Sequence, residues 1–248
     1  MARKPRESAR SKTKGSATDS GRTDAADDVV DRICATLSSA ISSGALKPGA
    51  KILDDVIAEH FGVSRTVVRG ALDVLQRDHL LERKRNRGAF VAEPSVEEAR
   101  QLFAARHGLE SVILGLVVQH ATDEGLDRLE ALNEEERHLP ENTGERGKVG
   151  PAPQFHVELA KLGKNEVLIE VLLKVLARVS LVNALYEVEP RDNCGDHRNI
   201  IAAIRRRDLE TARKLMEEHL VDLEERVRLT PNDGDHNGFI NVLQTFSA

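Results

Sequence analysis

Hydrophobic residues in the first third of the chain follow a pattern that changes from helical to strand-like. Residues 29–41 repeat Val, Ile or Leu every three to four positions, which predicts an amphipathic helix. Similar spacing predicts two shorter helices over 53–61 and 64–76. Two short runs, 81–83 and 89–91, read as strands with a turn between them and predict a hairpin. Three helices followed by a hairpin predict a winged helix-turn-helix.

From residue 95 onward the hydrophobic spacing is helical, with little sign of strands. Six helices are predicted, over 95–121, 122–139, 153–162, 165–187, 193–206 and 208–229. The stretch 140–151, rich in Gly and Pro, is predicted to be a loop. The helix 165–187 is apolar on nearly every side, so we expect it to run through the bundle centre or a subunit interface.

The predicted fold is therefore mainly α, with an N-terminal winged helix-turn-helix domain and a C-terminal antiparallel all-α bundle of about six helices. Residues 1–24 are polar and basic with almost no hydrophobic residue, so we expect a disordered arm that either touches DNA weakly or only aids solubility. The winged helix is assigned to 25–94 and the bundle to 95–230. The tail 231–248 has no assigned role.

Composition agrees with packed helices in a reducing compartment. Only 3% of the residues are aromatic and none is Trp, which favours helices over sheets. Cys34 and Cys194 are the only cysteines, so they can build neither a disulfide framework nor a thiolate zinc knuckle. No apolar run reaches the roughly 18 residues of a membrane span, and the N-terminus lacks an apolar signal segment. We expect a cytoplasmic protein without a membrane partner.

Charge is distributed unevenly along the chain. The formal net charge is −5, yet residues 1–24 carry seven basic side chains against three acidic, and residues 64–88 carry the same numbers. The remainder is strongly acidic. A local basic footprint on an otherwise DNA-repelling body is typical of a polyanion-binding module joined to a different domain.

The basic stretch contains a candidate recognition helix. Gly62 can take the left-handed turn that ends one helix, and Ser64 can cap the next. Arg65, Thr66 and Arg69 then fall on one exposed face, where arginine can bridge a guanine or clamp a phosphate. The alternative is an ordinary surface helix with two arginines.

The hairpin that follows favours the first interpretation. Arg85, Arg87 and Gly88 lie at its predicted tip. A basic hairpin directly after a recognition helix forms a wing, which lies near the sugar-phosphate backbone or in the minor groove. We therefore expect double-stranded DNA as a partner.

Three motifs in this region resemble those of the GntR family of bacterial transcription regulators. They are Ile41-x-x-Gly44-x-Leu46-x-Pro48-Gly49, then Phe61-Gly62-Val63-Ser64-Arg65-Thr66-x-Val68-Arg69-x-Ala71-Leu72-x-x-Leu75, then Arg87-Gly88-Ala89-Phe90-Val91. The chain departs from the family at Gly70, where Glu is usual. A partner for the neighbouring arginines within the helix is then missing.

Histidine spacing suggests a metal site in the bundle. His197 and His219 lie about ten residues on either side of a helix break near Arg207, so in an antiparallel hairpin both sit about 16 Å from the turn and can face each other. His156 on a third helix would complete a three-nitrogen set for a divalent metal, with Zn²⁺ as first choice. Three hydrogen-bonded structural histidines are the alternative.

The same half is similar to the FCD effector domain found in a large branch of the GntR family. The motifs that carry the similarity are Arg106-x-x-Leu109-Glu110, Phe155-His156-x-x-Leu159-Ala160, Gly163-x-Asn165, His197-x-x-Ile200 and Ala212-x-x-x-Met216-x-x-His219-Leu220. The resemblance implies an effector-binding and dimerisation domain.

Two positions in this half need interpretation. Many metal-binding members carry Asp where this chain has Ala152, so a fourth ligand would be water, an effector carboxylate or an acid such as Asp196. Arg106 is implied to point into the bundle and hold an anionic effector. The alternative for Arg106 is an ion pair with Glu110.

These observations predict a regulator rather than an enzyme. We expect a homodimeric repressor on an inverted-repeat operator, controlled by a small carboxylate or other anionic metabolite. One alternative is a metal-dependent hydrolase or lyase built on the three histidines. The other is a sensor of metal alone.

Overall fold

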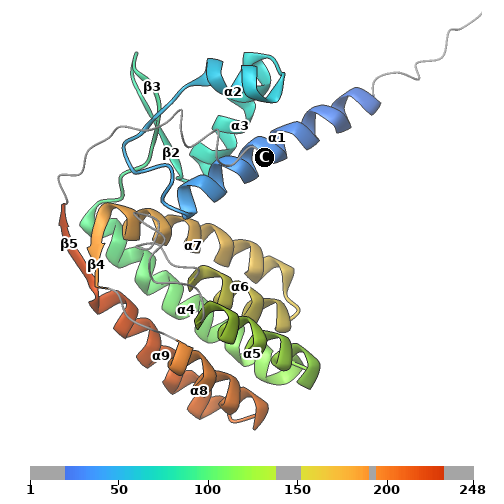
Figure 1. Ribbon diagram of the computed structural model, residues 1–248, viewed down its shortest axis with the longest axis vertical. Helices are drawn as coiled ribbons and strands as arrows, with labels where there is room; N and C mark the ends of the chain where they lie inside the picture. Colours follow the sequence, from blue (N-terminus) through green and yellow to red (C-terminus); the bar gives the residue numbers. More distant parts are fainter. Residues whose placement is uncertain (1–19, 138–151, 190–193, 232–248) are drawn as a thin grey trace, which may run out of the picture.

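The computed structural model describes residues 20–137, 152–189 and 194–231 (Figure 1). It has a small N-terminal domain of helices and one sheet, joined to a larger helical bundle, which confirms the predicted mainly α fold. The N-terminal elements are α1 (Ser20–Ser42), β1 (Lys51–Ile52), α2 (Asp54–Phe61), α3 (Arg65–Arg77), β2 (Leu81–Lys84) and β3 (Gly88–Val91). The C-terminal elements are α4 (Val96–His120), α5 (Asp123–Arg137), α6 (Ala152–Leu162), α7 (Glu166–Leu185), β4 (Tyr186–Val188), α8 (Cys194–Arg205), α9 (Leu209–Glu225) and β5 (Val227–Pro231).

The turn between α2 and α3 follows from two local signals. Gly62 has φ 66°, and its left-handed conformation lets the chain end α2 and turn sharply. Ser64 then caps α3 because its hydroxyl accepts a hydrogen bond from the Val67 amide. The inner face of α3 is buried in the domain core through Val68, Leu72 and other residues. These contacts fix the direction in which the outer face of α3 points.

The wing is part of a three-stranded sheet with the order β1-β3-β2. The predicted hairpin is present, with Leu81 opposite Val91 and Lys84 opposite Gly88. Its tip turns through two residues with positive φ, Asn86 at 59° and Gly88 at 97°. Strand β1, which the sequence did not reveal, pairs with β3 on the other side. A strand of two residues is too short to show a periodic pattern.

Helix α1 begins earlier than expected. We predicted a disordered arm over residues 1–24, but residues 20–24 already belong to α1. Once a helix has nucleated on a packed segment, here around Ile33 and Leu37, each added residue extends it at little cost, and no proline follows Ser20 in the helix. Residues 1–19 lie outside the described part, as do the predicted loop 140–151 and nearly all of the tail.

Helix α4 is the central element of the bundle and packs against α6, α7 and α9. By length and composition alone it would suffice to cross a membrane, with a mean hydropathy of 1.2 over 18 residues. It also carries two buried charged residues, Arg106 and Glu110, which point into the protein. These features are those of a core helix.

A second small sheet corrects one prediction. We expected helix as far as 187 and again as far as 229, but α7 ends at Leu185 and α9 at Glu225. The segments after them, β4 and β5, pair antiparallel, with Val188 opposite Val227. β-Branched and aromatic residues in these short segments fit a pleated strand better than a helix end. Over so few residues, helical periodicity in the sequence does not distinguish a strand from the end of a helix.

Helix α7 belongs to both domains. Leu181 is fully buried in the hydrophobic core of the N-terminal domain, and Ala177 packs against the same core. The opposite side of α7 packs on α4 and α6. Figure 1 shows the C-terminal end of α1 next to α7, where the two domains meet. Both domains therefore cover part of the apolar surface of α7, while Val167, Val171 and Leu173 remain exposed.

Two polar contacts reinforce this junction. Lys174 of α7 pairs with Asp78, directly after α3, at 3.5 Å. The Tyr186 hydroxyl donates to the carbonyl of Pro94 in the linker at 3.0 Å. These contacts link the segments that follow α3 and β3 to α7 and β4.

Candidate metal centre and DNA interface

The three predicted histidines converge inside the bundle. His156 comes from α6, His197 from α8 and His219 from α9, and all three are buried. The Nε2 of His219 lies 3.2 Å from Nε2 of His197 and 3.4 Å from Nε2 of His156. The ligand atoms of the three rings all lie within 4.8 Å of one another.

This spacing fits a metal ion. Two nitrogens bound tetrahedrally to zinc at about 2.05 Å are about 3.3 Å apart. The two measured Nε2 separations, 3.2 and 3.4 Å, bracket that value.

The α8–α9 hairpin explains why His197 and His219 meet. Arg207 has φ 57° and makes the turn, and Asp208 caps α9 through the Thr211 amide at 3.0 Å. The two helices then run antiparallel with the histidines at the same level, as their nearly equal distances from the break predict.

Each of the three rings also has an oxygen against its other nitrogen. Glu110 Oε2 lies 2.5 Å from Nδ1 of His156, and Asn133 Oδ1 lies 3.1 Å from Nδ1 of His197. Asp196 Oδ2 lies 3.5 Å from Nδ1 of His219. An acceptor at Nδ1 holds the proton there and leaves the lone pair on Nε2. Three lone pairs then point at one place, which is the arrangement that a cation requires.

Burial keeps the His156 and His219 rings neutral. It lowers the pKa of His219 far below the usual range, and the neighbouring His156 and His197 add to the effect. Burial also lowers the pKa of His156, and the Glu110 carboxylate offsets this only in part. Neutral imidazole is the form that binds metals.

Glu110 itself is ionised despite being buried. Burial alone would raise the pKa of its carboxyl, but His156 and Arg106 outweigh that effect and bring the pKa to about 2. Arg106 is the permanent cation of this group, and its Nε donates to Glu110 Oε1 at 2.6 Å. The ion pair that we considered as the alternative for Arg106 is therefore present. Glu110 lies between Arg106 and His156, so Arg106 reaches the histidine cluster only through Glu110.

The position of Asp196 changes the expected ligand set. Its carboxylate lies on the Nδ1 side of His219, away from the converging Nε2 atoms, so it supports a ligand rather than acting as the fourth one. Residue 152, at the start of α6, is alanine and so has no side-chain oxygen. The site as built presents three protein nitrogens.

The sequence interpretation missed the roles of two supporting residues. Asn133 is fully buried on α5, and Glu110 faces His156 across 46 residues of sequence. One signal for Asn133 was available, because it follows Leu126 and Leu129 at helical spacing on the buried stripe of α5. A polar residue in such a stripe needs a buried partner. No local signal joined Glu110 to His156.

The predicted DNA-contacting residues lie together on the outside of the N-terminal domain. Ser64, Arg65, Thr66 and Arg69 are exposed at the start of α3. Arg65 Nε lies 2.8 Å from Asp55 and Arg69 Nε lies 3.7 Å from Asp54. Many family members carry Glu at the position of Gly70. In this chain the two acids of α2 pair with the arginines instead.

The wing adds a second exposed basic group. Arg85, Arg87 and Gly88 at its tip are all exposed. The Arg87 guanidinium and the Lys84 ammonium lie 5.5 and 5.0 Å from the centre of the Phe90 ring, close enough for cation–π attraction. An ion pair between Arg83 and Asp73 ties the wing to α3. The wing and α3 are thus linked directly to each other.

Comparison with known proteins agrees with both halves. Residues 29–91 match the sequence profile of the bacterial regulatory proteins of the gntR family, and residues 101–222 match the FCD domain. The Uxu operon regulator of Haemophilus influenzae is 30% identical over 212 residues, which cover 76% of this chain and 78% of that protein. The chain belongs to the GntR family. It is a transcription regulator of that family with an FCD effector domain, and its relatives are regulators rather than enzymes.

Solved structures of other GntR regulators have a similar fold. Escherichia coli McbR/YncC superposes with a TM-score of 0.70 at 24% identity, covering 78% of this chain and 93% of that one. A GntR regulator from Rhodococcus sp. RHA1 gives a TM-score of 0.67 at 26% identity, covering 79% and 95%.

Proposed function

We propose that this GntR regulator is a cytoplasmic homodimeric repressor whose binding to an inverted-repeat operator is controlled by an anionic metabolite, held through a divalent metal in the FCD domain. The observation that carries the proposal is the convergence of three buried Nε2 atoms within a bundle that packs directly against the DNA-binding domain. A dimer that spans two half-sites covers promoter DNA and excludes other proteins from it.

DNA recognition is assigned to α3 and the wing. The N-terminal turns of α3 would enter the major groove, where Arg65 and Arg69 read bases and Ser64 and Thr66 contact the backbone. The wing, with Arg85, Arg87 and the Gly88 turn, would lie along the adjacent phosphates or minor groove. The mutual placement of the two exposed basic groups supports this assignment.

The metal is assigned to His156, His197 and His219, with zinc as first choice. A bound divalent ion would supply a positive centre with open positions for an anionic ligand. Because no protein carboxylate is among the three ligands, an organic carboxylate would meet less competition there. Arg106 is neutralised by Glu110, so it would reach an anionic ligand only through guanidinium N–H donors that this contact, made through Nε, does not use.

A hydrolase or lyase is the weaker candidate. It would need a general base beside the open metal positions. Both oxygens of Glu110 are already engaged, one by Arg106 and one by His156 on the Nδ1 side of the ring. Asp196 also lies on an Nδ1 side. A sensor of metal alone differs from our proposal only in lacking the organic ligand.

Dimerisation is assigned to the bundle. Helices α4 and α7 pack against each other and expose large hydrophobic side chains, with Val112 at 56%, Val167 at 71% and Val171 at 44% exposure. Burying such side chains against a second copy removes apolar surface from water. Two copies are also what an inverted-repeat operator requires.

The test combines metal analysis with operator binding. An operator would first be selected from random duplexes with the purified protein, and gel shifts would then be run with metal, chelator and a panel of small carboxylates. We expect one metal per chain in the wild type and a loss of metal in His219→Ala, but not in His120→Ala, which removes an exposed histidine of the same bundle. Operator affinity that stays the same with every metal, chelator and carboxylate would refute the control mechanism while leaving DNA recognition intact. A response to metal without any response to carboxylates would favour the metal-only sensor.

A further inference from the structure

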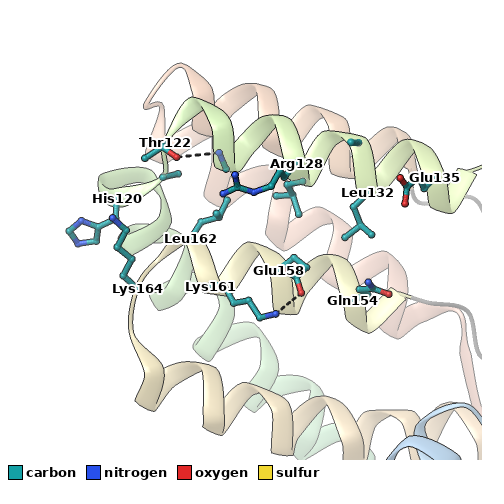
Figure 2. A pocket seen from close by; sticks show the side chains of 14 residues that line it. His120, Thr122, Arg128, Leu132, Glu135, Gln154, Glu158, Lys161, Leu162 and Lys164 are labelled. Atoms are coloured by element: carbon teal, nitrogen blue, oxygen red, sulfur yellow. Dashed lines mark hydrogen bonds and ion pairs between the residues drawn. The ribbon is translucent and has the colours of Figure 1, made fainter.

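A groove of about 740 Å³ lies between α5 and α6, on the outside of the bundle (Figure 2). Its middle is lined by leucines, among them Leu129, Leu132 and Leu162. A volume in this range is typical of small-molecule sites. Apolar lining of this kind favours the body of a ligand rather than water.

Basic side chains collect at one end of the groove. Figure 2 shows His120 and Lys164 at this end, with Arg128 reaching from α5 toward Leu162. Among the described residues, neither the Arg128 side chain nor the Lys164 side chain makes a hydrogen bond or ion pair, and the dashed lines in Figure 2 reach other residues. The opposite end carries Glu135 and Gln154.

Several acids near this end pair with other side chains. Arg205 of α8 holds Asp127 at 2.8 Å, Glu130 at 3.2 Å and Asp123 at 3.8 Å. Glu158, which lines the groove, is held by Lys161 at 2.6 Å. Among the described residues no carboxylate pairs with Arg128, so its guanidinium is open to a ligand, although Glu135 and Glu158 also line the groove.

Gly125 shapes the basic end. A Cβ at this position would come within 2.8 Å of Leu162 Cδ2, so the Leu162 side chain would have to shift to accommodate it. Its amide is also held, donating to the Thr122 hydroxyl at 3.2 Å. The Leu162 side chain of α6 therefore packs on α5 at Gly125, next to the Arg128 guanidinium.

We propose that this groove is a second ligand site, which binds an amphipathic oxyanion. The carboxylate or phosphate of the ligand would lie between Arg128 and Lys164, and an apolar chain or ring would cover the leucines toward Glu135. Arg128 and Glu135 are seven residues apart on α5, so the ligand body spans about 10 Å. The site is separate from the histidine cluster and does not require its metal.

The test measures binding of two defined probes to the full chain by titration calorimetry. The probes are 4-phenylbutanoate and 4-phenylbutyl phosphate, and 4-phenylbutanol serves as the uncharged analogue. We expect one saturable site per chain for at least one anion, and the tighter of the two identifies the head group. The alcohol should bind at least tenfold more weakly, and a chelator should leave the dissociation constant unchanged.

Variants locate the site. The double variant Arg128→Gln, Lys164→Gln should weaken binding at least tenfold, whereas Lys214→Gln, which removes an exposed lysine of α9, should not. All of these residues are exposed, so the variants should melt like the wild type. Several results would overturn the proposal: no saturable binding of either anion, equal binding of the alcohol, full affinity in the double variant, or loss of binding with the chelator.

Discussion

The contact between Glu110 and His156 offers the sharpest test of the metal centre, through the substitution Glu110→Gln. Arg106 needs an acceptor, so the Gln oxygen would stay with Arg106 and its amide NH₂ would face His156 Nδ1. A donor at Nδ1 forces the imidazole proton onto Nε2. That proton would point to the place where the three lone pairs meet, and it would block one of the three ligands.

The expected magnitude follows from the role of Glu110 as an outer support of a ligand. Changing such a residue lowers metal affinity by about 10- to 100-fold, or about 1.4 to 2.8 kcal/mol. The same substitution leaves the charge of Arg106, which is 6% exposed, without its anion. Breaking a buried ion pair costs about 3–5 kcal/mol, and because Gln keeps one hydrogen bond we expect a loss of about 3 kcal/mol in unfolding free energy.

Both quantities are directly measurable. Zinc affinity would be obtained by competition with a chromophoric chelator, and stability by urea unfolding of the metal-free protein. Glu217→Gln is the matched control, because Glu217 is an exposed carboxylate that contacts His107 on the same bundle. Wild-type zinc affinity in Glu110→Gln, in protein that remains folded, would refute the proposed proton placement.

Three further predictions concern DNA binding, backbone strain and assembly. Arg65→Ala and Arg69→Ala should each weaken operator binding by about 1–3 kcal/mol in gel shifts if these arginines read bases. If affinity for the operator and for random duplex falls equally, the arginines contact phosphates instead. Gly70→Ala should raise the unfolding free energy by about 0.5–1 kcal/mol, because Gly70 is helical and a Cβ there meets nothing within 4 Å. Gly62→Ala should lower the unfolding free energy by about 1 kcal/mol or more, because Gly62 has φ 66°. Thermal melts in which Gly62→Ala is the more stable variant would contradict this argument. Val112→Glu should shift the protein toward monomer in sedimentation, and an unchanged dimer would move the interface away from this part of α4.

Local signals in the sequence were enough for the winged helix. Gly62, Ser64 and the hydrophobic stripe of α3 act within a few residues of each other, so the spacing alone predicts the turn and the exposed arginines. The pairing of His197 with His219 was predictable for a related reason. Two helices joined by a short turn bring residues at equal distances from that turn together.

Contacts between distant segments could not be predicted in this way. Glu110 meets His156 because α4 and α6 pack side by side, and nothing near either residue in the sequence indicates the other. The same holds for Asp54 and Asp55, which orient the arginines of α3 in place of the expected Glu. The β4–β5 pair was missed because each strand directly follows a long helix whose periodicity hides the change.

Because Leu181 is buried in the N-terminal core, the DNA-binding domain of this regulator cannot simply be replaced by that of another protein. A winged helix taken from another family member and joined near residue 94 would arrive without the side chain that completes its core, because that side chain is supplied by α7. Removing a buried leucine costs about 2–5 kcal/mol, a large fraction of the stability of a small domain. A working hybrid would therefore have to transfer the contact face of α7 together with the DNA-binding domain, although the two are some eighty residues apart in the chain.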